Sequence, residues 1–97
     1  MDTRDEIIDT AADLFSEFGY GMVTTDRIAE RARVNESTIF RIFGSKSELA
    51  RAVMENEFER RLDPVFSPEM VERLDLRALA RWCVFKRERT NEIRQRL

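Results

Sequence analysis

The 97-residue sequence contains no histidine and only one cysteine, Cys83. Zinc and other transition-metal sites depend on clusters of these residues, so we expect no metal site and no cofactor. A single cysteine cannot form an internal disulfide, which agrees with the reducing conditions of the cytoplasm. The sequence also lacks a nucleophile–base pair and a glycine-rich phosphate loop, and it therefore argues against an enzyme.

Glycine and proline together supply only five residues, whereas charged residues make up 37% of the chain. Strong helix formers dominate, so the composition predicts an all-α protein. No apolar run approaches the roughly eighteen residues of a membrane-spanning helix. The N-terminus lacks the basic and apolar segments of a secretory signal. We therefore expect no membrane partner and a cytoplasmic location.

The chain also lacks an excess of basic residues. Residues 1–50 hold six basic and ten acidic side chains, a balance of −4, whereas residues 51–97 hold eleven basic and nine acidic, a balance of +2. Proteins that bind nucleic acid regardless of its sequence usually carry an overall positive charge. Any contact with DNA must therefore come from a local patch.

Apolar residues at three- and four-residue intervals predict a series of helices. Thr3 and Glu6 have the spacing of a capping box, which predicts Thr3 as the N-cap of the first helix. Gly19 is expected to end this helix in a left-handed conformation.

Two shorter helices are predicted next. Thr24 and Thr25 offer N-caps for a helix DRIAERAR, and Asn35 can cap a helix ESTIFRIF that ends at Gly44. Only about three residues, 33–35, separate the two helices. This is the arrangement of a helix-turn-helix.

The second half of the sequence predicts further helices. A capping box at residues 45–48 begins a fourth helix, which is expected to run through Leu62 and stop at residues 63–64. Residues 67–68 form a predicted N-cap with proline at the first helical position. The apolar periodicity then continues toward Arg89, and residues 90–91 are expected to begin a last, short helix.

Residues 7–49 resemble the DNA-binding domain of TetR-family transcriptional regulators, with the spacing kept without a gap. The matching residues are Ile8, Ala11, Ala12, Leu14, Phe15, Phe18, Gly19, Tyr20, Thr24, Thr25, Ile28, Ala29, Ala32, Val34, Ser37, Thr38, Ile39, Phe40, Phe43, Ser45, Lys46 and Leu49. The resemblance implies a homeodomain-like three-helix helix-turn-helix bundle, followed by a long fourth helix and the first helices of a truncated regulatory region. It implies a helix-turn-helix DNA-binding domain at residues 1–50, with its motif at about 24–43, and a connecting helix with a partial regulatory and dimerisation region at 51–97. It also implies that the protein acts as a bacterial transcriptional repressor, associated with the nucleoid in the cytoplasm.

The third helix is interpreted as a short recognition helix held by the first two. Ile39 and Phe43, four residues apart, are expected to face the core. Ser37, Thr38 and Arg41 then face outward, where a major groove would admit them. Thr38 can offer a methyl or a hydroxyl group, and Arg41 can reach a guanine or a phosphate. The alternative for all three is an ordinary solvated side chain.

The resemblance places Thr25, Phe40 and Lys46 beside the phosphate backbone. Thr25 and Lys46 lie at helix N-termini, whose free N–H groups attract phosphate. Thr24 and Thr25 also suit helix capping, and the two roles can coexist. The alternative for Lys46 is a surface residue within a capping box.

Four positions depart from the family pattern. Phe40 stands where the family usually has Tyr and Ile42 where it often has His, so two polar contacts are lost. Arg33 replaces the usual glycine of the turn, where a positive φ would cost about 1 kcal/mol, although its side chain could supply a new phosphate contact. Glu36 favours the helix dipole but would repel phosphate, and it could accept a hydrogen bond from cytosine N4.

Double-stranded DNA is thus the expected partner. The rival hypothesis is a degenerate relative that keeps the fold and acts as a helical protein–protein interaction module without binding DNA. Because the sequence stops at Leu97 within a helical pattern, we expect a fragment, with a small-molecule effector only in a longer form. We expect the chain either to bind DNA weakly as a monomer or to self-associate through residues 62–97, because part of the apolar surface there should remain exposed. These residues are Val65, Phe66, Trp82, Val84 and Phe85.

Overall fold

The computed structural model describes the backbone of residues 2–60 and 66–96, and the side chains of residues 2–59 and 66–88. Every regular element within these ranges is helical, so the predicted all-α class is confirmed. The elements are α1 (Thr3–Phe18), the 3₁₀ turn η1 (Tyr20–Met22), α2 (Thr25–Ala32), α3 (Glu36–Phe43), α4 (Lys46–Arg60), α5 (Pro68–Glu72) and α6 (Leu76–Arg96).

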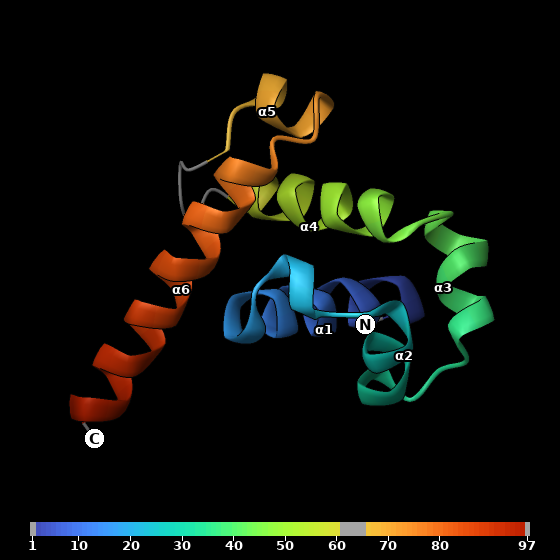
Figure 1. Ribbon diagram of the computed structural model, residues 1–97, viewed down its shortest axis with the longest axis horizontal. Coiled ribbons are helices and arrows are strands. Elements are labelled where there is room, and N and C mark those ends of the chain that lie inside the picture. Colours follow the sequence, from blue (N-terminus) through green and yellow to red (C-terminus); the bar gives the residue numbers. More distant parts are fainter. Residues whose placement is uncertain (1, 61–65, 97) are drawn as a thin grey trace.

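Helix α1 lies at the centre of the molecule (Figure 1). It packs against α2, α4 and α6, whereas α3 packs on α2 and α4. Its broad apolar face explains this position, because a helix with seven buried residues needs neighbours on several sides. Those residues are Ile7, Ile8, Ala11, Ala12, Leu14, Phe15 and Ser16. Helices α1, α2 and α3 thus form the predicted helix-turn-helix bundle.

The ends of α1 differ in detail from the prediction. Asp2, rather than Thr3, is the N-cap, and its side chain accepts a hydrogen bond of 2.9 Å from the backbone N–H of Asp5. Aspartate caps at least as well as threonine, and its charge also suits the positive end of the helix. At the other end, Gly19 has the expected positive φ of 87°, but its ψ of 146° lies outside the left-handed helical region.

The N-caps of α2 and α3 lie at predicted residues, but only the cap of α2 makes its side-chain hydrogen bond. Thr24 caps α2 and accepts a hydrogen bond of 3.2 Å from the N–H of Arg27, whereas Thr25 is already the first helical residue. Asn35 occupies the N-cap position of α3 without a side-chain cap hydrogen bond. The turn between them contains Arg33 at φ 60° and ψ 44°, so this arginine does adopt the left-handed conformation.

The capping box predicted at the start of α4 is half formed. Ser45 accepts a hydrogen bond of 3.1 Å from the N–H of Glu48, but the Glu48 carboxylate pairs with Arg51 instead of reaching back. An arginine one turn further along the helix is the stronger partner for a carboxylate. The predicted end of this helix at residues 62–64 lies outside the described residues.

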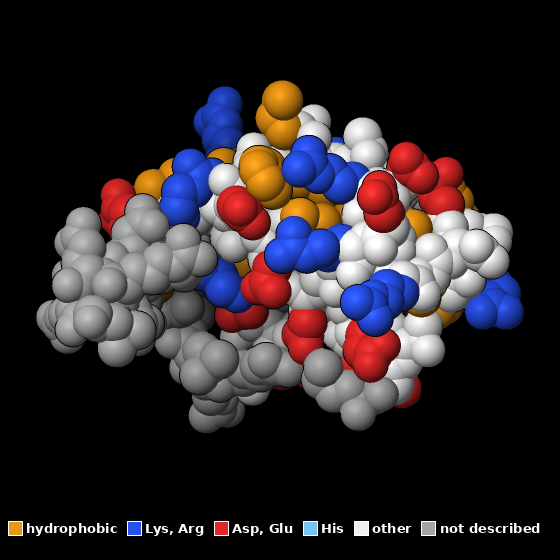
Figure 2. Space-filling view, turned by 90° about the horizontal axis from the view of Figure 1, so that it is seen from below, with side chains coloured by type: hydrophobic (Ala, Val, Ile, Leu, Met, Phe, Trp, Pro, Cys, Tyr) orange, Lys and Arg blue, Asp and Glu red, His pale blue; other side chains and the backbone are white. Residues whose placement is uncertain are grey.

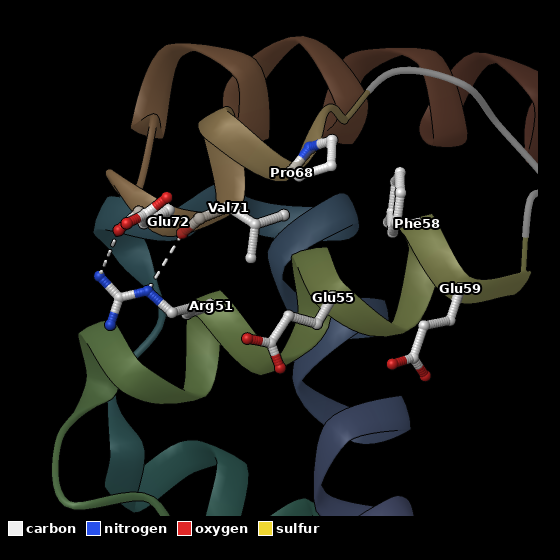
Figure 3. Close-up of a pocket in the computed structure, with 7 residues that line it drawn as sticks. All are labelled: Arg51, Glu55, Phe58, Glu59, Pro68, Val71 and Glu72. Carbon is white, nitrogen blue, oxygen red and sulfur yellow. Dashed lines mark hydrogen bonds between the residues drawn. The ribbon is translucent and has the colours of Figure 1, made fainter.

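The N-cap predicted for α5 is confirmed, because Ser67 accepts a hydrogen bond of 3.2 Å from the N–H of Met70. Arg51 of α4 ties this short helix down from the other end. Its Nε donates to the carbonyl of Val71 at 3.1 Å and its Nη2 to that of Glu72 at 3.2 Å (Figure 3). Carbonyls at the end of a helix lack partners within the helix, and Arg51 supplies a donor to Glu72 and a further donor to Val71, which also accepts from the N–H of Leu74 at 3.2 Å.

Leu74, at φ 51°, separates α5 from α6, and Asp75 caps α6 by accepting two backbone hydrogen bonds of 3.1 Å. Helix α6 then runs without a break for 21 residues. The separate last helix predicted from residues 90–91 is therefore wrong. Threonine and asparagine are good caps, but inside an established helix they are simply weaker helix formers.

The C-terminal helix buries more than the sequence predicted. Trp82 is fully buried and Phe66 is 3% exposed, because α6 packs against α1 and the rings of Trp82 and Phe66 meet, so only part of the expected apolar surface is exposed. Val84, at 52%, and Phe85, at 40%, are exposed as expected. Val65 lies outside the described residues. No hydrogen-bond partner for the buried indole N–H of Trp82 lies within the described part of the chain.

Candidate nucleic-acid interface

Helix α3 stands at the edge of the molecule, at the end of α1 opposite α6 (Figure 1). Ile39 is fully buried and Phe43 is partly buried against the core, so the predicted inward face is confirmed. Ser37 and Arg41 are exposed and Thr38 is half-buried. The side chains that could contact a groove thus project from a helix whose other face is fixed in the core.

A hollow of about 520 Å³ lies between the start of α1, the turn and α3. It is lined by Thr3, Arg33, Val34, Asn35, Thr38, Arg41 and Ile42. Arg33 and Arg41 are the only charged residues among those described in this lining. Neither guanidinium group has a hydrogen bond or an ion pair within the described part of the chain.

Thr25 and Glu36 lie on different helices but contact each other. The Thr25 hydroxyl donates a hydrogen bond of 2.7 Å to Oε2 of Glu36, and both side chains are half-buried. This bond joins the start of α2 to the start of α3. The sequence suggested two separate DNA contacts, and it gave no signal that two residues eleven positions apart would pair.

Lys46 is turned toward η1. Its Nζ donates a hydrogen bond of 2.6 Å to the backbone carbonyl of Tyr20 and lies 4.1 Å from the centroid of the Tyr20 ring. Partial burial lowers the pKa of the Lys46 ammonium group from its ordinary value of 10.5. The ring of Tyr20 also meets Phe15 edge to face at 5.2 Å. Lys46 therefore ties α4 to η1, a contact that the local sequence pattern did not reveal.

Two further side chains complete this end of the molecule. Phe40 is 46% exposed on α3, and an exposed phenylalanine can offer only an apolar contact. Arg4 of α1 lies with its guanidinium carbon 5.5 Å from the ring centroid of Phe43. No sequence signal indicates Arg4, because only the folded structure brings the start of α1 beside α3.

The wider surface carries both signs of charge. Figure 2 shows one face on which Lys and Arg side chains are interspersed with Asp and Glu rather than gathered in a patch. On such a mixed surface, Arg33 and Arg41 form a small positive region at α3, because neither has a partner of opposite charge within the described residues. This agrees with the prediction that any DNA contact must come from a small region.

A second concave region lies between α4 and α5, away from α3 (Figure 3). This pocket has a volume of about 530 Å³ and is lined by Arg51, Glu55, Phe58, Glu59, Pro68, Val71 and Glu72. Arg51 is occupied by the carbonyls at the end of α5. Within the described residues, no three His, Cys, Asp or Glu side chains are grouped as a metal site would require. No described helix is both long enough and apolar enough to span a membrane.

Residues 7–53 match the family described as bacterial regulatory proteins, tetR family. The chain is 41% identical over 59 residues to the uncharacterised HTH-type transcriptional regulator YvkB of Bacillus subtilis, covering 61% of this chain and 31% of that protein. It is 46% identical over 48 residues to the HTH-type transcriptional regulator TcmR of Streptomyces glaucescens, covering 50% of this chain and 21% of TcmR. It is also 35% identical over 60 residues to IcaR of Staphylococcus epidermidis, the negative transcriptional regulator of the biofilm operon icaADBC, covering 62% of this chain and 32% of IcaR. The aligned region thus spans a third or less of these relatives, and no solved structure matches the chain.

Proposed function

The chain belongs to the tetR family of bacterial regulatory proteins, and we propose that it is a sequence-specific DNA-binding transcriptional regulator that reads the major groove with α3. The observation that carries this proposal is the two-sided character of α3. Buried Ile39 fixes the helix, while Arg41 projects outward without a partner in the described part of the chain. A side chain held in this way is available to a base edge.

The proposed contacts divide into base and backbone contacts. Ser37, Thr38 and Arg41 face the groove, where an arginine can bond both acceptors of guanine and a threonine methyl can meet thymine. Glu36, at the head of α3, can accept from cytosine N4 with the oxygen that does not hold Thr25.

Backbone contacts come from residues near helix starts. Thr24 and Thr25 at the start of α2 and Lys46 at the start of α4 are proposed to lie beside phosphates, as is Phe40 on the exposed side of α3. The bond from Lys46 to the carbonyl of Tyr20 does not prevent this role. An ammonium group has three N–H donors, and one hydrogen bond leaves two for a phosphate.

The finer parts of the function follow from the relatives by extension. IcaR is described as a negative regulator, and we propose repression for this chain as well. We also propose that residues 1–50 form the DNA-binding domain and that residues 51–97 begin a regulatory and dimerisation region. Self-association through residues 62–97, and a small-molecule effector in a longer form, belong to this proposal.

The test is a titration of fluorescent duplex DNA, first with random sequence and then with a site selected from random duplexes. The selected site should bind more tightly, and the affinity for both duplexes should fall steeply between about 50 and 200 mM salt as counterions are released. No binding even at 50 mM salt would contradict the proposal. It would favour a helical protein–protein interaction module instead.

A further inference from the structure

Two residues other than glycine have a positive φ in the described chain: Arg33 at 60° and Leu74 at 51°. A side chain in this region is strained because its Cβ crowds the backbone, and glycine avoids the strain. Leu74 is half-buried and packs against the hydrophobic core, so its packing offsets the strain. Arg33 is exposed, and its guanidinium group has no partner within the described residues.

The backbone at Arg33 does not require an arginine. The N–H of this residue caps α2 by donating to the carbonyls of Ala29 and Glu30, and glycine would donate in the same way. The strained residue therefore gains nothing from its side chain inside the described part of the protein. Strain without internal compensation is a feature of sites that meet an external partner.

The surroundings of Arg33 indicate which partner this is. The hollow of about 520 Å³ beside α3 is lined by Arg33 and Arg41, with polar groups from Thr3, Asn35 and Thr38. No carboxylate lies in the described lining, although residues 1–50 carry a balance of −4. Two positive charges at the border of one hollow give it a positive potential, which favours an anion.

We propose that this hollow is a binding site for one phosphate of the DNA backbone, and that Arg33 is its principal ligand. The phosphate lies at the edge of the major groove that α3 enters, so the inference rests on the proposed function. Arg41 borders the hollow from α3 and adds to its positive potential, while its planar group remains directed at the base edges. Arginine suits this site because its guanidinium group binds phosphate oxygens in a two-pronged way.

The test is the pair Arg33→Gly and Arg33→Lys, with Arg81→Ala on exposed α6 as a control that removes one positive charge elsewhere. Arg33→Gly should keep or raise the midpoint of urea unfolding, because the strain is relieved. It should weaken the selected and random duplexes by the same factor. The slope of log affinity against log salt should decrease by about one unit. Arg33→Lys should retain most of that slope, and Arg81→Ala should bind as the parent does.

The outcomes separate this inference from the function on which it rests. If the parental chain binds DNA and Arg33→Gly has the same affinity and salt slope, the phosphate site is overturned and the proposed function remains. Parental chain that fails to bind any duplex overturns both. A loss on one sequence only, with an unchanged slope, also overturns the phosphate assignment.

Discussion

At the α2–α3 end of α1, Arg33 and Arg41 project into solvent without partners in the described part of the chain, and one of them has a strained backbone. At the α6 end, Trp82 is fully buried and Phe66 lies against it, with ring centroids 6.1 Å apart. One end thus gives up stability to leave charges available, while the other gains stability from aromatic burial. The comparison teaches that a small protein can keep unpaired charges and a strained backbone residue on its surface if aromatic burial in a distant part of the same core stabilises the fold.

The largest effect should come from removing the aromatic anchor. Trp82→Ala should lower the free energy of unfolding by about 3–5 kcal/mol, because it leaves a large cavity beneath α6. Urea denaturation followed by circular dichroism measures the loss. Val84→Ala, at a side chain that is 52% exposed, is the control and should cost well under half as much. Equal costs for the two variants would show that α6 does not anchor the fold.

At the opposite end, Arg41→Ala should leave stability nearly unchanged, because its guanidinium group has no partner in the described chain. It should instead cost about 1–3 kcal/mol of binding free energy on the selected duplex, if Arg41 bonds a guanine. Competition between selected and random duplexes measures the change. Unaltered discrimination between them would remove Arg41 from base recognition.

Lys46 combines the two roles, since it ties α4 to Tyr20 and is proposed to lie beside a phosphate. Lys46→Met should therefore lower stability by about 1 kcal/mol and also reduce the salt slope of DNA binding by about one unit. Chemical denaturation and salt titration of the same variant measure both quantities. If only stability changes, Lys46 belongs to the scaffold and makes no backbone contact.

The smallest effect at neutral pH concerns Cys83 on the buried side of α6, because its thiol is protonated there in both states. Burial raises the pKa of its thiol from 9.0 to about 11. The folded protein therefore holds this proton more tightly than the unfolded chain, and the thiol lowers stability as the pH rises from about 9 to 11. Cys83→Ala should remove this part of the pH dependence. Labelling of the parental thiol at pH 8 should be slow until urea unfolds the protein, and rapid labelling of folded protein would contradict this burial.

Several features could be predicted because their signals are local. The cap at Thr24 follows from a good capping residue just before a helical pattern, the cap at Ser67 from the proline after it, and the inward phase of Ile39 from helical periodicity. The start of α1 was displaced by one residue because Asp2 and Thr3 are both good caps. Adjacent residues of similar capping strength cannot be separated without the packing that follows them.

The contacts that the sequence did not predict join residues that are far apart along the chain. Thr25 pairs with Glu36 across eleven positions, and Lys46 reaches Tyr20 across twenty-six. The burial of Trp82 depends on α6 crossing α1, which periodicity within α6 cannot reveal. An apolar face in a sequence shows that something covers it, but not which segment does so.

The placement of α6 on α1 affects how the chain folds while it is being synthesised. Nε of Arg87 donates a hydrogen bond of 2.9 Å to the carbonyl of Ser16, so two residues 71 positions apart meet in the native state. Helix α1 leaves the ribosome before α6, which forms part of its cover. At about 5–20 residues per second, part of the apolar face of α1 stays uncovered for several seconds on each nascent chain. Until α6 emerges, that face is a surface on which a chaperone can act.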